Sequence, residues 1–167
     1  MVPLAELFAR HHVELYRYVA RFTGDADLAE DVVQDAFVRL AERPPADETQ
    51  LRGWLFRVAT TIAIDALRGA RRRLALVRER PERQPVGDPP PDPAAALERE
   101  ETRRRVREAL RALSEKERAV LLMREEGFAH REIAAAVGTT TQSVGTMIAR
   151  ALEKLARHLD LDAEESR

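Results

Sequence analysis

Apolar side chains recur along the first part of the chain at the three- and four-residue spacing of an α-helix. One such segment begins at Leu28, and a Pro-Pro pair closes it. Asp27, with Glu30 three residues later, is expected to cap this helix. A longer segment over about 50–70 repeats the spacing, and residues 4–22 form an earlier helix. Because no stretch alternates apolar and polar residues, the pattern predicts an all-α protein.

The second part of the chain carries helix boundaries that can be read residue by residue. Ser114 and Glu117 match a capping box, in which each residue satisfies a backbone N–H at the start of a helix. Gly127 can end that helix, since glycine tolerates a left-handed conformation. Thr140 or Thr141 can cap the last helix. These boundaries indicate short helices joined by tight turns.

Residues 130–159 match the requirements of a helix-turn-helix. Such a motif needs a small residue where its helices cross, a turn residue that tolerates positive φ, and an apolar anchor on the second helix. Ala134, Gly138 and Val144 occupy these three places. The first turns of the second helix could then enter the major groove of DNA. An ordinary helical hairpin that packs a core remains the alternative.

Proline divides the chain into two parts. Six of its nine prolines fall within residues 81–93, where the fixed φ and the missing amide hydrogen exclude a continuous helix. We therefore expect two small helical domains joined by a Pro-rich linker. The expected boundaries are 1–73 for the first domain, 74–98 for the linker, 99–159 for the second domain and 160–167 for an acidic tail.

Charge is distributed unevenly, although the formal net charge is only −1. Residues 1–51 carry five basic and ten acidic side chains, whereas residues 52–83 carry nine basic and three acidic ones. This segregation favours an acidic surface for a protein partner and a separate basic surface for phosphate. Helical faces that simply alternate in sign would account for the same counts.

Several classes of function are not supported by the residues. The chain has no cysteine, and its four histidines are not spaced as a ligand set, so we expect no disulfide, metal or cofactor. It has no nucleophile–base pair or phosphate-binding loop, so we expect no enzyme. No apolar run approaches the roughly 18 residues that a membrane helix needs, and the N-terminus lacks the pattern of a signal peptide. We therefore expect a cytoplasmic protein without membrane insertion.

Three motifs together resemble the extracytoplasmic-function, or group 4, sigma factors of the sigma-70 family. They are AEDVVQDAFVRL, GWLFRVATTIAIDALRGARRR and ALSEKERAVLLMREEGFAHREIAAAVGTTTQSVGTMIARALEKL, in this order around the linker. The resemblance implies a transcription initiation factor. Its region 2 would dock on the β′ clamp helices of core RNA polymerase and would melt and read the −10 element. Its region 4 would bind the β flap and read the −35 element. An anti-sigma factor is a further partner that the resemblance suggests.

The resemblance assigns candidate site residues to three surfaces, each with its own partner. Those for core polymerase are Asp31, Gln34, Asp35 and Arg39. Those for the −10 element are Trp54, Arg57, Thr60, Thr61, Arg68, Arg71, Arg72 and Arg73. Those for the −35 element are Arg131, Thr140, Thr141, Gln142, Ser143, Gly145, Thr146, Met147 and Arg150.

Some of these positions depart from the family or have a simpler structural interpretation. The family usually carries Arg-Asn where this chain has Thr60-Thr61, so we expect altered −10 readout, because threonine lacks the paired amide hydrogen bonds of asparagine. Gly145 and Met147 replace residues that are usually basic, which implies an altered −35 preference. Trp54 could stack on an unpaired base, although a lone tryptophan is more often a core anchor. The acidic side of the helix after Leu28 could equally be solvated.

Two other functions compete with the sigma interpretation. A stand-alone helix-turn-helix regulator would bind operator DNA without polymerase, and a helical interaction protein would not bind DNA. Linker length is compatible with a sigma factor, because residues 74–98 can extend to about 80 Å at roughly 3.3 Å each. Promoter elements some 25 base pairs apart are separated by about 85 Å at roughly 3.4 Å per step.

Overall fold

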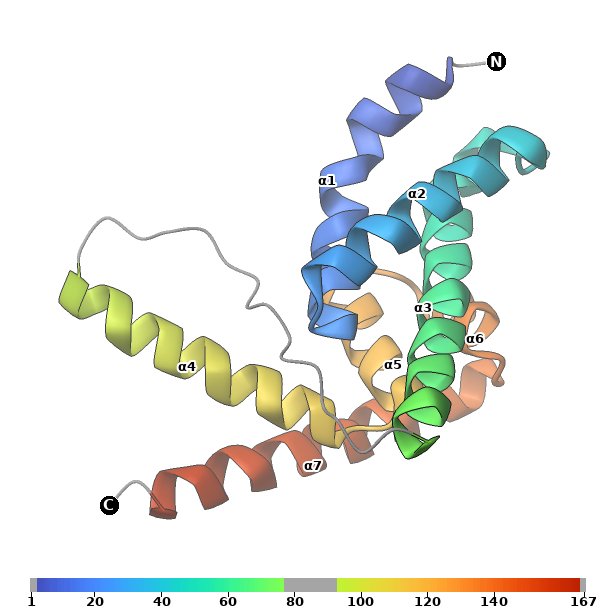
Figure 1. The fold of residues 1–167 in the computed structure, drawn as a ribbon. Helices are drawn as coiled ribbons and strands as arrows, with labels where there is room; N and C mark the ends of the chain where they lie inside the picture. The colour runs from blue at the N-terminus through green and yellow to red at the C-terminus, as the bar shows by residue number, and fades with distance from the viewer. Residues whose placement is uncertain (1–2, 77–92, 166–167) are drawn as a thin grey trace.

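The computed structural model describes residues 3–76 and 93–165, with side chains at all of these except 48, 75–76, 93–96 and 161–165. The described residues contain helices and no strand, which confirms the all-α prediction (Figure 1). The elements are α1 (Leu4–Thr23), α2 (Ala26–Glu42), the 3₁₀ turn η1 (Glu48–Gln50), α3 (Leu51–Leu76), α4 (Pro93–Ala112), α5 (Glu115–Glu125), α6 (His130–Val137) and α7 (Thr141–Glu165).

The connection between α1 and α2 corrects the expected cap of α2. Gly24 adopts a left-handed conformation with φ of 69°, which ends α1. Asp25 then lies in an extended conformation, and its carboxylate accepts a hydrogen bond from the backbone N–H of Leu28 at 3.0 Å. Asp25 is therefore the N-cap. Asp27 lies in the first turn of α2 instead, where its negative charge interacts favourably with the positive end of the helix dipole.

The predicted boundaries in the second part of the chain are confirmed. The Ser114 N–H donates to Glu117 Oε2 at 3.0 Å, and the Ser114 hydroxyl accepts from the Glu117 N–H at 3.3 Å, completing the capping box. Gly138 ends α6 with φ of 67°. Of the two threonines that could cap α7, Thr140 accepts a hydrogen bond from the Ser143 N–H at 3.3 Å.

Helices extend further than the expected domain boundaries on both sides of the proline-rich segment. Helix α3 continues to Leu76, and α4 begins at Pro93, where the missing N–H of proline costs nothing because the first turn of a helix has no acceptor for it. Residues 74–76 and 93–98 of the expected linker are thus helical. The central part of that linker, 77–92, lies outside the described residues. Helix α7 also continues beyond residue 160, into the expected acidic tail.

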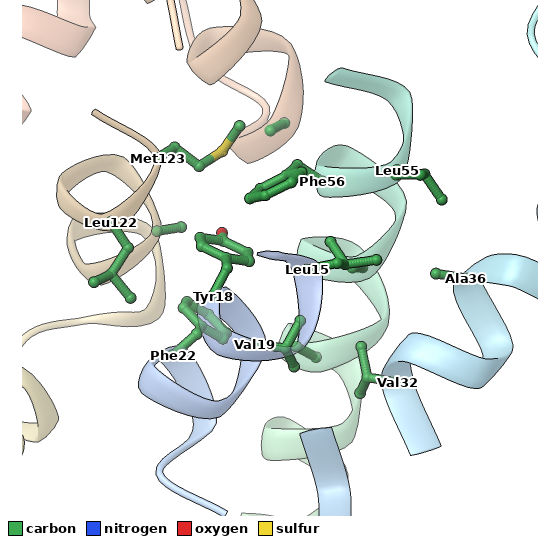
Figure 2. Close-up of a cluster of buried hydrophobic side chains, with 14 of the residues drawn as sticks. Leu15, Tyr18, Val19, Phe22, Val32, Ala36, Leu55, Phe56, Leu122 and Met123 are labelled. Carbon is green, nitrogen blue, oxygen red and sulfur yellow. The ribbon is translucent and has the colours of Figure 1, made fainter. Parts of the chain in front are cut away.

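The two helical units do not stand apart. Helices α1, α2 and α3 form a bundle, α4 lies along α7, and α5 and α6 pack against α1 and α3 (Figure 1). Figure 2 shows the shared core, in which side chains of all four of α1, α2, α3 and α5 gather. It labels Leu15, Tyr18, Val19, Phe22, Val32, Ala36, Leu55, Phe56, Leu122 and Met123. The units expected to be separate domains therefore share one continuous core.

Candidate polymerase and promoter interface

Helix α2 presents a polar face opposite its buried stripe. Val32, Val33 and Phe37 are buried against the bundle. The exposed side carries the residues expected to bind core polymerase, which we call the α2 polar face: Asp31, Gln34, Asp35 and Arg39. Their spacing of three and four residues places the first three on one side of the helix. Val38, which the sequence analysis missed, is 55% exposed on the same side and adds an apolar contact point.

Helix α3 carries an exposed stripe that includes three of the expected −10 residues. Arg57, Thr61 and Arg68 are exposed, and Asp65 lies between the last two. Spacings of four, four and three keep these side chains on one side of the helix. We call this row the α3 stripe. It offers two guanidinium groups and one carboxylate to a partner that approaches along the helix, while the Thr61 hydroxyl donates to the Arg57 carbonyl oxygen at 3.0 Å.

Thr60 is not part of that stripe, and in this arrangement its side chain is not accessible to DNA. It is fully buried, on the side of α3 that also buries Phe56. Its hydroxyl donates to the Phe56 carbonyl oxygen at 2.6 Å, so Tyr18 must be the donor in the 2.7 Å contact between the two hydroxyls. Burial raises the pKa of Tyr18, which keeps this donor protonated. Thr60 thus holds α1 against α3.

Trp54 lies at the edge between core and surface. It packs against the buried cluster and also lines a cavity of about 500 Å³. Arg57 and the η1 turn line the same cavity from the first half of the chain, and Arg131, Glu132 and Ala135 line it from α6. Trp54 thus packs against the core, as a core anchor would, and also lines a polar cavity.

The last turns of α3 hold three exposed arginines that we call the arginine cluster, defined as Arg71, Arg72 and Arg73. Nη1 of Arg71 lies 2.6 Å from Oε1 of Glu115 at the start of α5. One of the three cations is therefore already paired with the second half of the chain. Arg72 and Arg73 make no ion pair with any residue that the structure describes.

The helix-turn-helix has the expected geometry. Ala134 and Val144 are buried where α6 and α7 meet, and Gly138 supplies the turn. Most of the expected −35 residues are exposed, namely Arg131, Thr140, Thr141, Gln142, Gly145, Thr146 and Arg150. The first turns of α7 are thus free to meet a partner.

Three of the expected −35 residues have structural tasks as well. The Thr140 and Ser143 hydroxyls lie 2.8 Å apart and form part of the cap of α7. Met147 is half-buried against the core, so its side chain is only partly available. Gln142 and Thr146 are exposed polar side chains on the first turns of α7 that make neither of these contacts.

The described residues offer little for other chemistry. No group of three or more histidine or carboxylate side chains gathers as metal ligands within residues 3–76 and 93–165. No helix in that part of the chain has the length and apolarity needed to cross a bilayer.

Comparison with known proteins identifies two family regions in the chain. Residues 7–73 match sigma-70 region 2, and residues 103–155 match sigma-70 region 4. The chain is 35% identical over 165 residues to the ECF RNA polymerase sigma factor SigG of Mycobacterium tuberculosis, which covers 85% of this chain and 45% of SigG. It therefore spans about half the length of that relative. It is 31% identical over 166 residues to the RNA polymerase sigma factor CarQ of Myxococcus xanthus, covering 97% of this chain and 92% of CarQ.

The fold is also that of a solved structure. The sigma factor RpoE from Bartonella quintana, in complex with the anti-sigma factor NepR, superposes with a TM-score of 0.72 at 20% identity, covering 95% of this chain and 97% of RpoE. In this chain region 2 precedes the proline-rich segment and region 4 follows it. This chain belongs to the extracytoplasmic-function sigma factors of the sigma-70 family.

Proposed function

We propose that this chain is a transcription initiation factor that binds core RNA polymerase and directs it to specific promoters, without catalysis of its own. The observation that carries the proposal is the pairing of an exposed helix-turn-helix with a matched region 2 whose α2 polar face is open to solvent. Such a factor would work in the cytoplasm, where polymerase is.

The α2 polar face is the proposed docking surface for the β′ clamp helices. Gln34 and Asp35 can accept hydrogen bonds from a basic helical partner, and Val38 can bury apolar area beside them. These side chains are not needed for the core of the bundle, because the buried stripe lies on the opposite side of α2. The β flap is the proposed partner of region 4.

The two DNA surfaces are the α3 stripe with the arginine cluster and the first turns of α7. Guanidinium groups on α3 suit phosphate contacts, which position a protein on DNA. Trp54, at the other end of the same helix, has a π-face that an unpaired base could stack on. Gln142 and Thr146 present hydrogen-bonding groups to base edges in the −35 element. An anti-sigma partner is also proposed, supported by the fold shared with RpoE, which was solved with NepR.

Pull-down with purified core polymerase, followed by run-off transcription, tests the proposal. The wild-type chain should bind core and start transcription from a promoter that core alone ignores. Gln34→Ala/Asp35→Ala should keep its helix content yet lose at least tenfold in affinity for core, equivalent to about 1.4 kcal/mol.

Glu98→Ala on α4 is the control, because it also removes an exposed acid but lies away from α2. Core affinity unchanged in the folded double variant would place the docking surface elsewhere. Tight, sequence-specific binding of promoter duplex by the free chain, without core, would favour a stand-alone regulator instead.

A further inference from the structure

A cavity of about 610 Å³ lies in the first half of the chain, where the start of α1, the end of α2 and the start of α3 meet. The segment between α2 and η1 also lines it. No residue of the α2 polar face, the α3 stripe or the arginine cluster is part of its wall. Small-molecule sites typically have volumes of about 300–1,000 Å³. The cavity therefore has the size of a ligand site, and the function proposed above makes no use of it.

Most of the cavity wall is apolar. Leucine side chains reach it from three helices, namely Leu4 and Leu7 of α1, Leu40 of α2 and Leu51 of α3, and the Pro44-Pro45 pair lines it from the segment after α2. Leu40 and Leu51 are buried, whereas Leu4 is 43% exposed. Such a wall favours a ligand with an apolar body, because covering Leu4 removes apolar area from water.

The titratable side chains in the wall are all basic. They are Arg10, His11 and Arg52, and no acidic side chain among the described residues lines the cavity. This composition is opposite to that of the surrounding sequence, because residues 1–51 carry ten acidic side chains and only five basic ones. A cavity with basic and apolar walls attracts an anion and disfavours a cation.

Two of these three basic groups carry no free positive charge. Nε of Arg52 donates to Oε1 of Glu14 at 2.6 Å, and its Nη2 donates to the Glu126 carbonyl oxygen at 3.0 Å. Arg52 is thus committed to contacts within the protein. The side chain of His11 is only 14% exposed, and burial lowers its pKa, so the ring is neutral at pH 7. Both side chains complete the wall without offering a charge to a ligand.

Arg10 is the cation that remains. Its Nη2 lies 2.8 Å from Oε1 of Glu6, in an ion pair whose two side chains are 56% and 57% exposed. Exposed ion pairs contribute little because water screens them, so Arg10 can exchange Glu6 for another carboxylate. The available charge thus lies on the exposed side of the cavity, and the buried Leu40 and Leu51 lie on its inner side.

We propose that this cavity binds a small organic acid that has an apolar body and one carboxylate. Arg10 pairs with the carboxylate at the rim, and the leucines cover the apolar body. A cationic ligand or a purely polar one lacks one of these two contacts. Because the wall joins three helices, a bound acid stabilises their packing and raises the Tm of the protein.

Isothermal titration calorimetry of the full chain with decanoate tests the proposal. Decanoate should bind at a single site and should raise Tm. Acetate lacks the apolar body, and decyltrimethylammonium carries the same alkyl chain with the opposite charge. Both should bind at least about tenfold more weakly than decanoate. The proposal fails if decanoate shows no saturable binding, or if decyltrimethylammonium binds as tightly as decanoate.

Two substitutions at the rim test the role of Arg10. Arg10→Gln should weaken decanoate binding about tenfold, because a hydrogen bond to a charged group is lost. Glu6→Gln should strengthen it about two- to fivefold by freeing Arg10. Arg17→Gln is the matched control and should bind as the wild type does. Arg17 is exposed on the same helix, lies outside the cavity wall and makes no ion pair within the described residues.

A third substitution fills the cavity. Ala41 lines it and is exposed, so the ring of Ala41→Phe can occupy the place of the ligand. This variant should lose decanoate binding, whereas Ala9→Phe, at an exposed position of α1 outside the wall, should retain it. Circular dichroism should show the same helix content in all variants. Wild-type affinity in a folded Arg10→Gln or Ala41→Phe protein would overturn the site. The proposed function would then still stand, because neither polymerase nor DNA takes part in this binding.

Discussion

Arg118 offers the sharpest test of how the two halves are held together. It is buried, with 4% of its surface exposed, and its guanidinium donates to backbone carbonyl oxygens. Nη1 donates to Phe22 at the end of α1 at 2.6 Å, and Nε donates to Leu110 at the end of α4 at 2.8 Å. Nη2 makes longer contacts with the carbonyl oxygens of Arg111 and Leu113. One side chain thus satisfies the C-terminal carbonyls of two helices, which have no partner within their own helices.

Arg118→Met should therefore destabilise the protein strongly. A hydrogen bond to a charged group is worth about 1.5–3 kcal/mol, and the two short ones carry most of the effect. Two such hydrogen bonds suggest a loss of about 3–5 kcal/mol, because the variant leaves the Phe22 and Leu110 carbonyl oxygens without this donor. For a chain of this size each kcal/mol lowers Tm by roughly 2–4 °C, so Tm should fall by about 6–20 °C.

Thermal and urea unfolding followed by circular dichroism would measure this loss. Arg124→Met is the control, because Arg124 is exposed on the same helix and makes no ion pair within the described residues, so its effect should stay within about 0.5 kcal/mol. The wild type should unfold in one transition, because the two halves share one core. A loss below about 1 kcal/mol for Arg118→Met would refute the reasoning, since those carbonyls would then be satisfied without it.

Three further predictions concern a buried hydrogen bond, a carboxylate and the DNA surfaces. Tyr18→Phe should cost about 1 kcal/mol in urea unfolding, because Thr60 loses a donor, and an unchanged urea midpoint would contradict that contact. The hydrogen bond from the Lys154 side chain, followed by those from Ser114, lowers the pKa of Glu117 from its usual 4.5. The charged Glu117 carboxylate therefore stabilises the fold above pH 4.5, and this stabilisation is lost as the pH falls through the lowered pKa. The stability advantage of the wild type over Glu117→Gln should shrink as pH falls below about 4.5, and an advantage that does not change with falling pH would contradict the ion pair. Replacing the arginine cluster by alanine should reduce the salt dependence of open-complex formation by about one unit of slope for each phosphate that is no longer neutralised. Gln142→Ala should instead change the preferred −35 sequence and leave the slope unchanged. The reverse pattern across a −35 library would show that the reading surfaces are misplaced.

Features that depend on residues close together in the chain were predictable. The capping box of Ser114 and Glu117 and the left-handed turn at Gly138 follow from the geometry of a few neighbouring residues, and both are confirmed. The cap of α2 shows the limit of this reasoning. Two aspartates two residues apart could each serve, and the left-handed Gly24 decided for Asp25 by ending α1 one residue earlier.

The sequence predicted the candidate surfaces as helix faces. It did not predict which of their side chains would be exposed. Exposure of the α2 polar face follows from helical periodicity, since its apolar side is buried. Thr60 directly precedes the exposed Thr61 of the α3 stripe but lies on the buried side of the helix, where it contacts Tyr18. A small polar residue gives no signal of burial until its partner is known.

The sequence alone therefore determined the helices, the helix-turn-helix and the polar helix faces proposed to meet polymerase and DNA, because these depend on spacing within a few turns. Tertiary structure alone decided how the halves dock. Arg118 and Phe22, which meet at their interface, are 96 residues apart, and Arg52 and Glu126 are separated by 74. Contacts at such separations depend on how whole helices pack, and arginine at these positions looks the same in the sequence as one facing solvent. The packing of α5 and α6 against α1 and α3 thus depends on the whole folded chain, and no single motif predicts it.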